Sequence, residues 1–448
     1  MDVFRIFHRF EPVSWSKLVL LAVAVGVGAG GGAVVFRSSI LVLQSFLYQI
    51  YPGDDISLAI LDIPWWMRLV IPAFGGLLVG AIVYFGKFKE VQGHGVPEVM
   101  ESFVKRKGKM RLIIAPTKAL LSAITIASGG ATGREGPIVQ IGAAIGSSLG
   151  QTFRLRPEYV KVLLAAGAAA GIGGTFNAPL AGVVFAWEVL FPKIQKRYLG
   201  VLLIASLVGT VFANSIIGFQ VRGLRGSVFQ IPSFEIINSW EFLLYGVLGL
   251  LAAFVGATYI RVLYTTEDFF EDLPVPVLLK PALGGLLVGV IALMFPQIFG
   301  FASYSTIEGV LNTSTAPLVL ITLLIAKLLA TSITLGSGGS GGVFAPALYL
   351  GAMLGGAFGG VFHGMFPASV SASPSYAVVG IGAVFAAAAH APFSAIIIIV
   401  EMTSWPLDSL IPISLACWVS YRVTKYTHAR SIYTEKLHRK HIRTKDFG

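Results

Sequence analysis

Two short segments place glycine, proline and free backbone amides in an arrangement that suits anion binding. Residues 133–137 read GREGP and residues 342–346 read GVFAP, each after a longer glycine-rich stretch. Proline fits the first turn of a helix, so we expect helices to begin at Pro137 and Pro346. A helix start offers unpaired N–H groups and the positive end of the helix dipole, which bind anions without formal charge. Close helix packing would also explain one such break, but two breaks with the same spacing favour an anion site.

Glu135 lies inside the first segment, between Arg134 and Gly136. An acid at membrane depth is costly and usually functional. Its carboxylate stands beside the N–H groups expected to hold the anion, so it can occupy the anion's place and be displaced when protonated. We therefore expect a gate and a possible proton carrier, with a fixed Arg134–Glu135 ion pair as the alternative reading. A third break, His94-Gly95-Val96-Pro97, is expected to converge on the same site.

The two segments occupy equivalent positions in an internal duplication. Residues 72–80 (PAFGGLLVG) return as residues 281–289 (PALGGLLVG) at an offset of 209, and residues 178–188 match 391–401 at an offset of 213. Interrupted apolar segments at matching places in two halves are typical of membrane transporters with a central site. The expected fold is therefore all-α: two inverted-topology repeats whose broken helices meet at a mid-membrane anion site. We expect one transmembrane domain over 1–448, with repeats at about 17–217 and 238–424 and a cytoplasmic tail at 425–448.

The composition indicates that the lipid bilayer is the solvent. Hydrophobic residues make up 55% of the chain and charged residues 12%, and the mean hydropathy is +0.79, far from the usual soluble mixture. Long apolar runs are expected to cross the membrane, at 18–36, 66–85, 112–128, 199–217, 241–256 and 316–335. Shorter helices are expected at about 137–149, 158–172, 179–190, 277–294, 346–364, 375–388, 392–403 and 408–424, and a short one from Pro97.

The net charge of +11 reflects topology. Basic residues cluster outside the apolar runs, which by the positive-inside rule places both termini of a multi-pass cell-membrane protein in the cytoplasm. No basic domain with interleaved aromatic residues suggests a nucleic-acid partner. Cys417 is the only cysteine, which excludes an internal disulfide and a thiolate metal site. No motif calls for a metal or another cofactor.

On these motifs the chain resembles the CLC family of chloride channels and chloride/proton antiporters, from about residue 17 to 437. Residues 133–137 and 342–346, together with 176–182 (FNAPLAG) and 401–403 (EMT), match the family's motifs. The resemblance implies a homodimer with an independent pore in each subunit, carrying chloride or another small anion. It also implies that backbone amides of Val343 and Phe344 hold the anion, that Glu135 is the external gate, and that Tyr433 closes the pore from inside. The remaining residues implied in the lining of the anion site are Gly95, Val96, Arg134, Gly136 and Ala345. For Tyr433, an interfacial aromatic anchor is the alternative.

Two positions depart from the family pattern. His94 stands where a serine usually contacts the anion; its ring can donate one N–H to the anion, or point aside and be satisfied by a backbone carbonyl. Val189 stands where proton-coupled members usually carry an internal acid. Transport is then either uncoupled, which we favour, or coupled through water or another group, with Glu188 the obvious candidate. The ordinary role of Glu188 would be packing at a helix end.

Other readings of the sequence are open to test. Lys118 and Lys327 are equivalent in the repeat and lie in apolar runs; we expect structural pairing with glutamates rather than a role in attracting anions. Gly338-Gly339-Ser340-Gly341 resembles the serine motif of rhomboid-type intramembrane proteases, whose serine would need His363 or His390 as a base. A cation-coupled transporter of organic solutes is the other rival. It would carry more acids at the breaks than Glu135 alone, so we expect a transporter of a small anion and no enzyme.

Overall fold

The computed structural model describes residues 14–86, 91–191, 195–220, 229, 234, 236–403 and 407–442. Within these residues the chain is helical, and the only extended pairings are two isolated β-bridges. Seven helices are long and apolar enough to cross a membrane, and five further apolar helices are shorter. The all-α architecture expected from the composition is confirmed.

Among its described residues the first half contains nine α-helices and follows the expected plan. The helices are α1 (Trp15–Tyr48), α2 (Ile56–Asp62), α3 (Trp65–Gly86), α4 (Val96–Lys105), α5 (Ile114–Ala127), α6 (Glu135–Thr152), α7 (Pro157–Phe176), α8 (Pro179–Phe185) and α9 (Leu199–Gln220). A π-helical turn, η2 (Ala186–Leu190), continues α8, and the 3₁₀ turn η3 (Lys196–Tyr198) precedes α9. The helix α6 begins two residues earlier than expected, because Glu135 itself opens its first turn.

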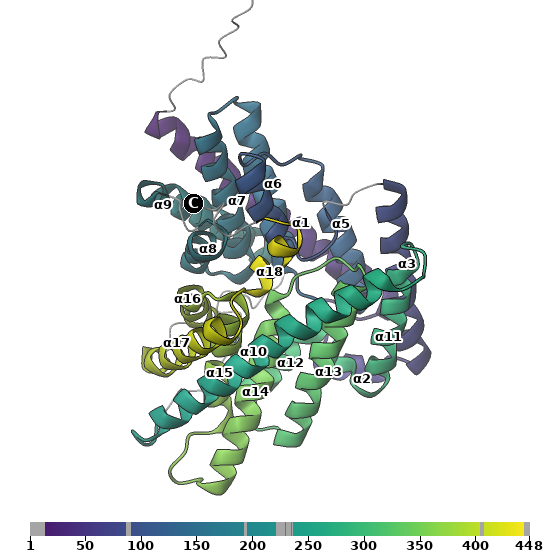
Figure 1. The fold of residues 1–448 in the computed structure, drawn as a ribbon, viewed down its shortest axis with the longest axis vertical. Coiled ribbons are helices and arrows are strands. Elements are labelled where there is room, and N and C mark those ends of the chain that lie inside the picture. Colours follow the sequence, from purple (N-terminus) through teal and green to yellow (C-terminus); the bar gives the residue numbers. More distant parts are fainter. Residues whose placement is uncertain are drawn as a thin grey trace, which may run out of the picture.

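The second half repeats this order. The helices are α10 (Glu241–Asp272), α11 (Lys280–Met294), α12 (Ser303–Asn312), α13 (Pro317–Gly336), α14 (Phe344–Met365), α15 (Ser373–Ala389), α16 (Pro392–Met402), α17 (Leu410–Thr427) and α18 (Ile432–Arg439). Three 3₁₀ turns, η4 (Pro296–Ile298), η5 (Gly300–Ala302) and η6 (Leu407–Ser409), join them. In Figure 1, α6, α7, α8 and α9 of the first half lie above α14, α15, α16 and α17 of the second, while α3 of the first half lies beside α11 of the second. The apolar pattern did not predict α2, α12 or α18, and it placed the end of α10 too early.

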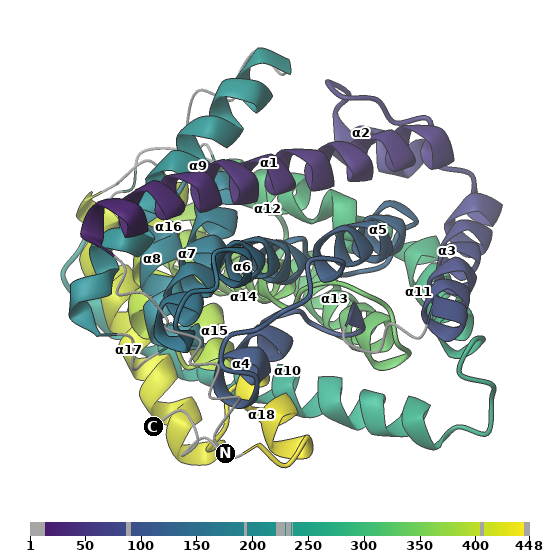
Figure 2. The same ribbon diagram turned by 90° about the horizontal axis from the view of Figure 1, so that it is seen from above.

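The two halves are related by a local two-fold axis. Gly133 and Gly342, which are equivalent in the duplication, form an antiparallel bridge: each N–H donates to the other's carbonyl, at 2.9 and 2.7 Å. Antiparallel pairing of equivalent residues means that the two chain directions are opposed, as inverted repeats require. In Figure 2, α1 and α10 run along opposite sides of the molecule, with α6 and α14 between them.

Reciprocal glycine contacts pack the equivalent helix pairs. A Cβ added to Gly142 of α6 would strike the carbonyl of Gly167 of α7, and the reverse is also true. Gly351 of α14 and Gly380 of α15 make the same exchange in the second half. Small residues at such crossings let backbones approach closely in membranes. The core helices α7 and α14 are thereby buried over most of their length, and they surround the glycine breaks.

Candidate anion site

The three glycine breaks meet at the centre of the fold. The bridge between Gly133 and Gly342 joins the breaks before α6 and α14, and a parallel bridge joins Gly93 to Ser340. Gly95 has a φ of +86°, which a residue with a Cβ rarely adopts. A Cβ there would also strike the carbonyl of Gly136. The His94–Val96 loop, the start of α6 and the start of α14 thus form one cluster, as the sequence predicts.

The Glu135 side chain reaches the start of α14. It is 1% exposed, and its Oε2 accepts a hydrogen bond from the Ala345 backbone N–H at 3.3 Å. Its Oε1 accepts a hydrogen bond from the Tyr304 hydroxyl. The first N–H groups of any helix lack intrahelical partners, so the carboxylate supplies an acceptor at a position that suits an anion.

The contact between Arg134 and Glu135 is longer than a fixed, hydrogen-bonded ion pair would be. The Arg134 Nε lies 3.8 Å from Glu135 Oε1, and this nitrogen makes no hydrogen bond within the described part of the chain. Instead, the Arg134 guanidinium stacks over the Tyr304 ring, 4.5 Å from its centroid. Tyr304 is therefore a site residue that the sequence analysis missed, because α12 was not predicted.

Aromatic rings connect the start of α14 to Tyr433. The Phe344 ring lies 4.4 Å from that of Phe385 and 5.3 Å from that of Phe176. Phe185 lies edge-on to both Phe344 and Tyr433, at 6.2 and 6.3 Å between ring centroids. Tyr433 is 1% exposed, so it is not an aromatic anchor at the membrane surface. It lies one ring away from the Val343–Ala345 turn, whose Val343 carbonyl accepts from the Tyr259 hydroxyl at 3.3 Å.

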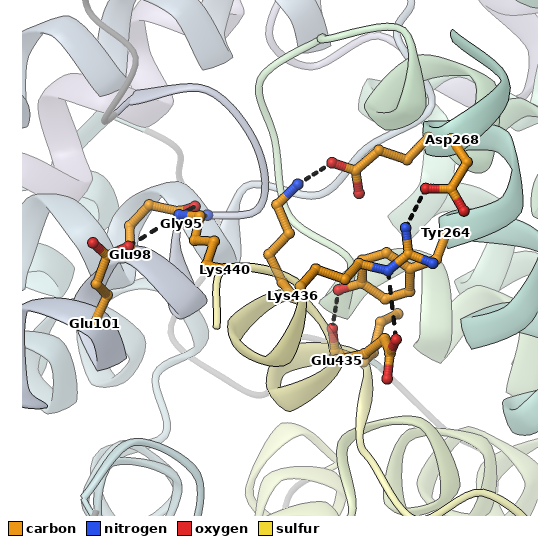
Figure 3. A network of polar contacts seen from close by, with 11 residues as sticks. Gly95, Glu98, Glu101, Tyr264, Asp268, Glu435, Lys436 and Lys440 are labelled. Carbon is orange, nitrogen blue, oxygen red and sulfur yellow. Dashed lines mark hydrogen bonds and ion pairs between the residues drawn. The ribbon is translucent and has the colours of Figure 1, made fainter. Parts of the chain in front are cut away.

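The short helix α18, which carries Tyr433, is held in place by ion pairs (Figure 3). Lys436 pairs with Glu267 and Arg439 with Asp268, both on α10. The Lys440 ammonium lies 3.2 Å from Glu98 Oε1 and 3.1 Å from Glu101 Oε2, both on α4. These contacts attach the tail to both halves of the molecule.

Glu98 relays this attachment to the first glycine break. Its second oxygen, Oε2, accepts a hydrogen bond from the Gly95 N–H at 3.0 Å, while Oε1 faces Lys440 (Figure 3). Partial burial lowers the pKa of the Lys440 ammonium, but Glu98 and Glu101 together raise it above its ordinary value. The tail, α4 and the His94 loop are thereby joined through one carboxylate.

His94 is buried beside this relay. It is 3% exposed, and its ring lies 6.1 Å from that of Tyr264. Its Nδ1 is buried and has no hydrogen-bond partner among the described residues. The carbonyl partner that the sequence analysis considered as an alternative is therefore not found at this nitrogen, which leaves an unpaired ring nitrogen at the break.

Glu188 has a structural partner rather than an open position. Its carboxylate accepts hydrogen bonds from the Phe393 N–H at 3.2 Å and the Ser394 N–H at 2.6 Å, in the first turn of α16. Glu401 of α16 does the same for Leu180 and Ala181 in the first turn of α8, at 3.2 and 2.7 Å. The helix-end role is the one this geometry favours for Glu188. The neighbouring Val189 is buried in η2.

The two buried lysines do not pair with glutamates as we expected. The Lys118 ammonium donates to the carbonyls of Val91 and Gly93, at 3.0 and 2.7 Å. The Lys327 ammonium donates to the Ile298 carbonyl at 2.6 Å and to the Ser303 hydroxyl at 2.8 Å. Each lysine satisfies carbonyls of an irregular segment that no helix could pair. Their role is structural, but the partner prediction was wrong.

The serine that suggested a protease is not activated. Ser340 Oγ lies 2.9 Å from Ser122 Oγ, whereas the His363 Nδ1 is 2.8 Å from the Val370 carbonyl at the far end of α14. His390 is the left-handed residue that ends α15. In the described structure neither imidazole contacts Ser340, so the base that such a nucleophile needs is missing.

Comparison with known proteins identifies the family. A family model described as "Voltage gated chloride channel" matches residues 75–425. The putative chloride channel protein ClcB-like of Ralstonia nicotianae is 35% identical over 428 residues, covering 94% of this chain and 97% of the relative. The voltage-gated ClC-type chloride channel ClcB of Escherichia coli (strain HS) is 29% identical over 401 residues, covering 89% of this chain and 94% of the relative.

Solved structures agree with this assignment. A slow cyanobacterial Cl⁻/H⁺ antiporter superposes with a TM-score of 0.83 at 27% identity, over 94% of this chain and 97% of the other. A CLC-type fluoride/proton antiporter at 23% identity, with a TM-score of 0.74 over 94% of this chain and 98% of the other, shares the fold. Members of this family are transporters rather than enzymes. The broken-helix site, the inverted repeats and these matches together show that the chain belongs to the voltage-gated chloride channel (CLC) family.

Proposed function

We propose that this protein carries chloride, or a closely related small anion, across the cell membrane along a path gated by Glu135. The observation that supports this most directly is the Ala345 N–H donating to the Glu135 carboxylate at the start of α14. A protein carboxylate there occupies a position whose helix dipole and free N–H groups suit an anion. The names of the relatives and of the cyanobacterial structure agree with chloride as the cargo.

Opening of the gate exchanges one anion for another. When protonation or competition moves Glu135 away, the Ala345 N–H is released and can hold chloride together with the N–H groups of Val343 and Phe344. These groups carry partial rather than full charges, so binding compensates for lost hydration while release stays fast. Tyr433, one aromatic ring from Phe344, closes the inner side, and an N–H from His94 takes the place of the family's serine hydroxyl.

We propose that transport is not coupled to protons. Val189 cannot carry a proton, and the Glu188 carboxylate is occupied by the first turn of α16. Proton-coupled exchange is the second candidate, because the chain is similar over 94% of its length to a slow Cl⁻/H⁺ antiporter. In that case protons would reach Glu135 through water rather than through an internal acid.

The assembly and orientation are further parts of the proposal. A homodimer is expected to form through the exposed apolar side chains of α8, α9, α16 and α17, among them Ile411 at 65% exposure. Both termini are expected in the cytoplasm. The interface is tested by crosslinking through a single new cysteine, in the variant Cys417→Ser, Ile411→Cys. The native Cys417 is buried and is replaced so that only position 411 can react. A crosslinked dimer in membranes supports the interface, and exclusively monomeric protein contradicts it.

The decisive experiment is chloride efflux from proteoliposomes with external pH recorded at the same time. Chloride flux without proton movement, increased in Glu135→Ala, would support uncoupled transport. Uphill proton movement driven by the chloride gradient, and lost in Glu135→Ala, would establish the antiporter instead. Absence of halide flux in a correctly folded protein would refute both versions.

A further inference from the structure

A hollow lies beside the Glu135 gate, between α1, the glycine break before α6 and α12. Its volume is about 210 Å³, whereas a single water needs only roughly 15 Å³. Among the described residues that line it there is no carboxylate, and the polar ones include Arg37, Gln44, Thr132, Arg134, Tyr304 and Ser305. The hollow is therefore roomy and lined by positive charge.

Two guanidinium groups share this hollow without enough negative charge to balance them. Arg37 comes from the apolar helix α1 and is half-buried, and the positive charge of Arg134 acts on it. No acceptor for Arg37 is found in the described part of the chain. The carboxylate nearest to Arg134 is that of Glu135, at 3.8 Å, and its oxygens are engaged by Tyr304 and Ala345. The other contact of Arg134 is the neutral Tyr304 ring, over which it stacks. Like charges placed together away from water are costly unless an anion pairs with them.

Unpaired donors accompany the charges. Thr132, also in the lining, is 0% exposed and its hydroxyl has no hydrogen-bond partner among the described residues. Arg134 Nε is likewise buried without a hydrogen bond. Buried polar atoms in native proteins normally have partners, so these two donors point to a ligand that supplies several acceptor atoms.

We propose that this hollow binds a polyatomic oxyanion of the sulfate, phosphate or carboxylate class, and that the bound ion slows access to Glu135. Guanidinium presents a planar fork that pairs with two oxygens of one oxyanion, whereas a single chloride cannot fill both positions. The size of the hollow and its several donors also suit a larger ion. The hollow shares Arg134 with the lining expected for the transported anion. The effect on access to Glu135 rests on the proposed gate, whereas oxyanion binding is tested without it.

Binding is tested with purified full-length protein in detergent, by calorimetric titration of sulfate at fixed chloride and ionic strength. We expect saturable binding that weakens about tenfold in Arg37→Gln, because a charge-assisted contact is lost. Arg37→Lys keeps the charge without the fork and is expected to lie between the two. Lys17→Gln removes the same charge from an exposed position at the other end of α1 and should bind sulfate like the wild type.

Three results would overturn the proposal: no sulfate binding to the folded wild type, equal affinity in Arg37→Gln, or chloride binding as tightly as sulfate at this site. Repeating the titration in lipid nanodiscs distinguishes the source of the oxyanion. If the affinity for sulfate is unchanged in discs with anionic lipid, the natural ligand is a soluble oxyanion. If sulfate no longer binds in these discs, a lipid phosphate occupies the hollow, and the soluble ion is refuted. In efflux assays, sulfate should slow wild-type flux at concentrations about tenfold below those needed for Arg37→Gln.

Discussion

Removal of the Tyr304 hydroxyl tests how the Glu135 gate is held shut. In Tyr304→Phe the ring that stacks on Arg134 is retained, and one of the hydrogen bonds to the Glu135 carboxylate is lost. A hydrogen bond to a charged group contributes about 1.5–3 kcal/mol. That range corresponds to a shift of roughly tenfold to a hundredfold between closed and open gate. The Ala345 N–H remains as a partner, so the gate is weakened rather than removed.

The assay is chloride efflux at fixed pH from proteoliposomes of known protein content. Tyr304→Phe should increase the initial rate by about tenfold or more, up to the rate of Glu135→Ala, which has no gate. The matched control is Tyr349→Phe, since the Tyr349 hydroxyl is buried without a partner in the described structure; its rate should not change. In the Glu135→Ala background Tyr304→Phe should have no further effect. An equal rate increase in that background would refute the reasoning, because the hydroxyl would then act on something other than the gate.

Three further perturbations test other parts of the site. Glu188→Gln should lower thermal stability, since a helix-capping carboxylate contributes about 0.5–2 kcal/mol, while leaving the proton-to-chloride ratio unchanged; a changed ratio would return Glu188 to the proton path. Val189→Glu should introduce proton movement with chloride efflux, and purely uncoupled flux in a folded variant would contradict the reading of this position. Lys440→Met should increase hydrogen exchange over α18. Because Glu98 and Glu101 raise the pKa of Lys440 above its ordinary value, its stabilising contact persists at neutral pH and is lost only as pH rises through the raised value. Protection at α18, measured as exchange relative to the intrinsic rate at each pH, that already falls between pH 6 and 9 would argue against this clamp.

Most of the membrane helices could be predicted because their apolar length and their boundary prolines are local signals. The change of offset from 209 to 213 also has a structural counterpart. Gly142 and Gly351 are still related by 209, while Gly167 and Gly380 are related by 213. The four additional residues therefore lie between Gly351 and Gly380, in the hairpin of α14 and α15, and α14 is four residues longer than α6.

Hydropathy failed where polar segments pack inside the protein. The helix α12, with the sequence SYSTIEGVLN, is too short and polar to predict as a membrane helix, yet it positions Tyr304. The internal duplication could have predicted α12. In the first repeat α4 precedes the helix that carries Lys118, just as α12 precedes the helix that carries Lys327. The end of α10 was missed because Glu267 and Asp268 interrupt its apolar run, although these acids are the partners of α18.

The contacts within the site could be predicted only in outline. The convergence of the glycine breaks followed from the duplication, and the Glu135 approach to α14 followed from its place beside free N–H groups. The partners of Lys118 and Lys327 did not follow, because the carbonyls they bind belong to irregular segments whose path depends on the whole fold. Opposite charge predicted glutamate partners for these lysines, but their ammonium groups instead donate to backbone carbonyls that no helix pairs.

The exchange of carboxylates between α8 and α16 has a consequence for biogenesis. The first turn of α8 is completed by Glu401, more than two hundred residues later in the chain. While the ribosome is still making the second repeat, the first one lacks the carboxylate that pairs two amide N–H groups of this turn in the folded protein, and unpaired N–H groups are costly in a membrane. We therefore expect the first repeat to complete its folding only after the second repeat has been synthesised. Its vulnerability to quality-control proteases should end when residue 401 enters the bilayer.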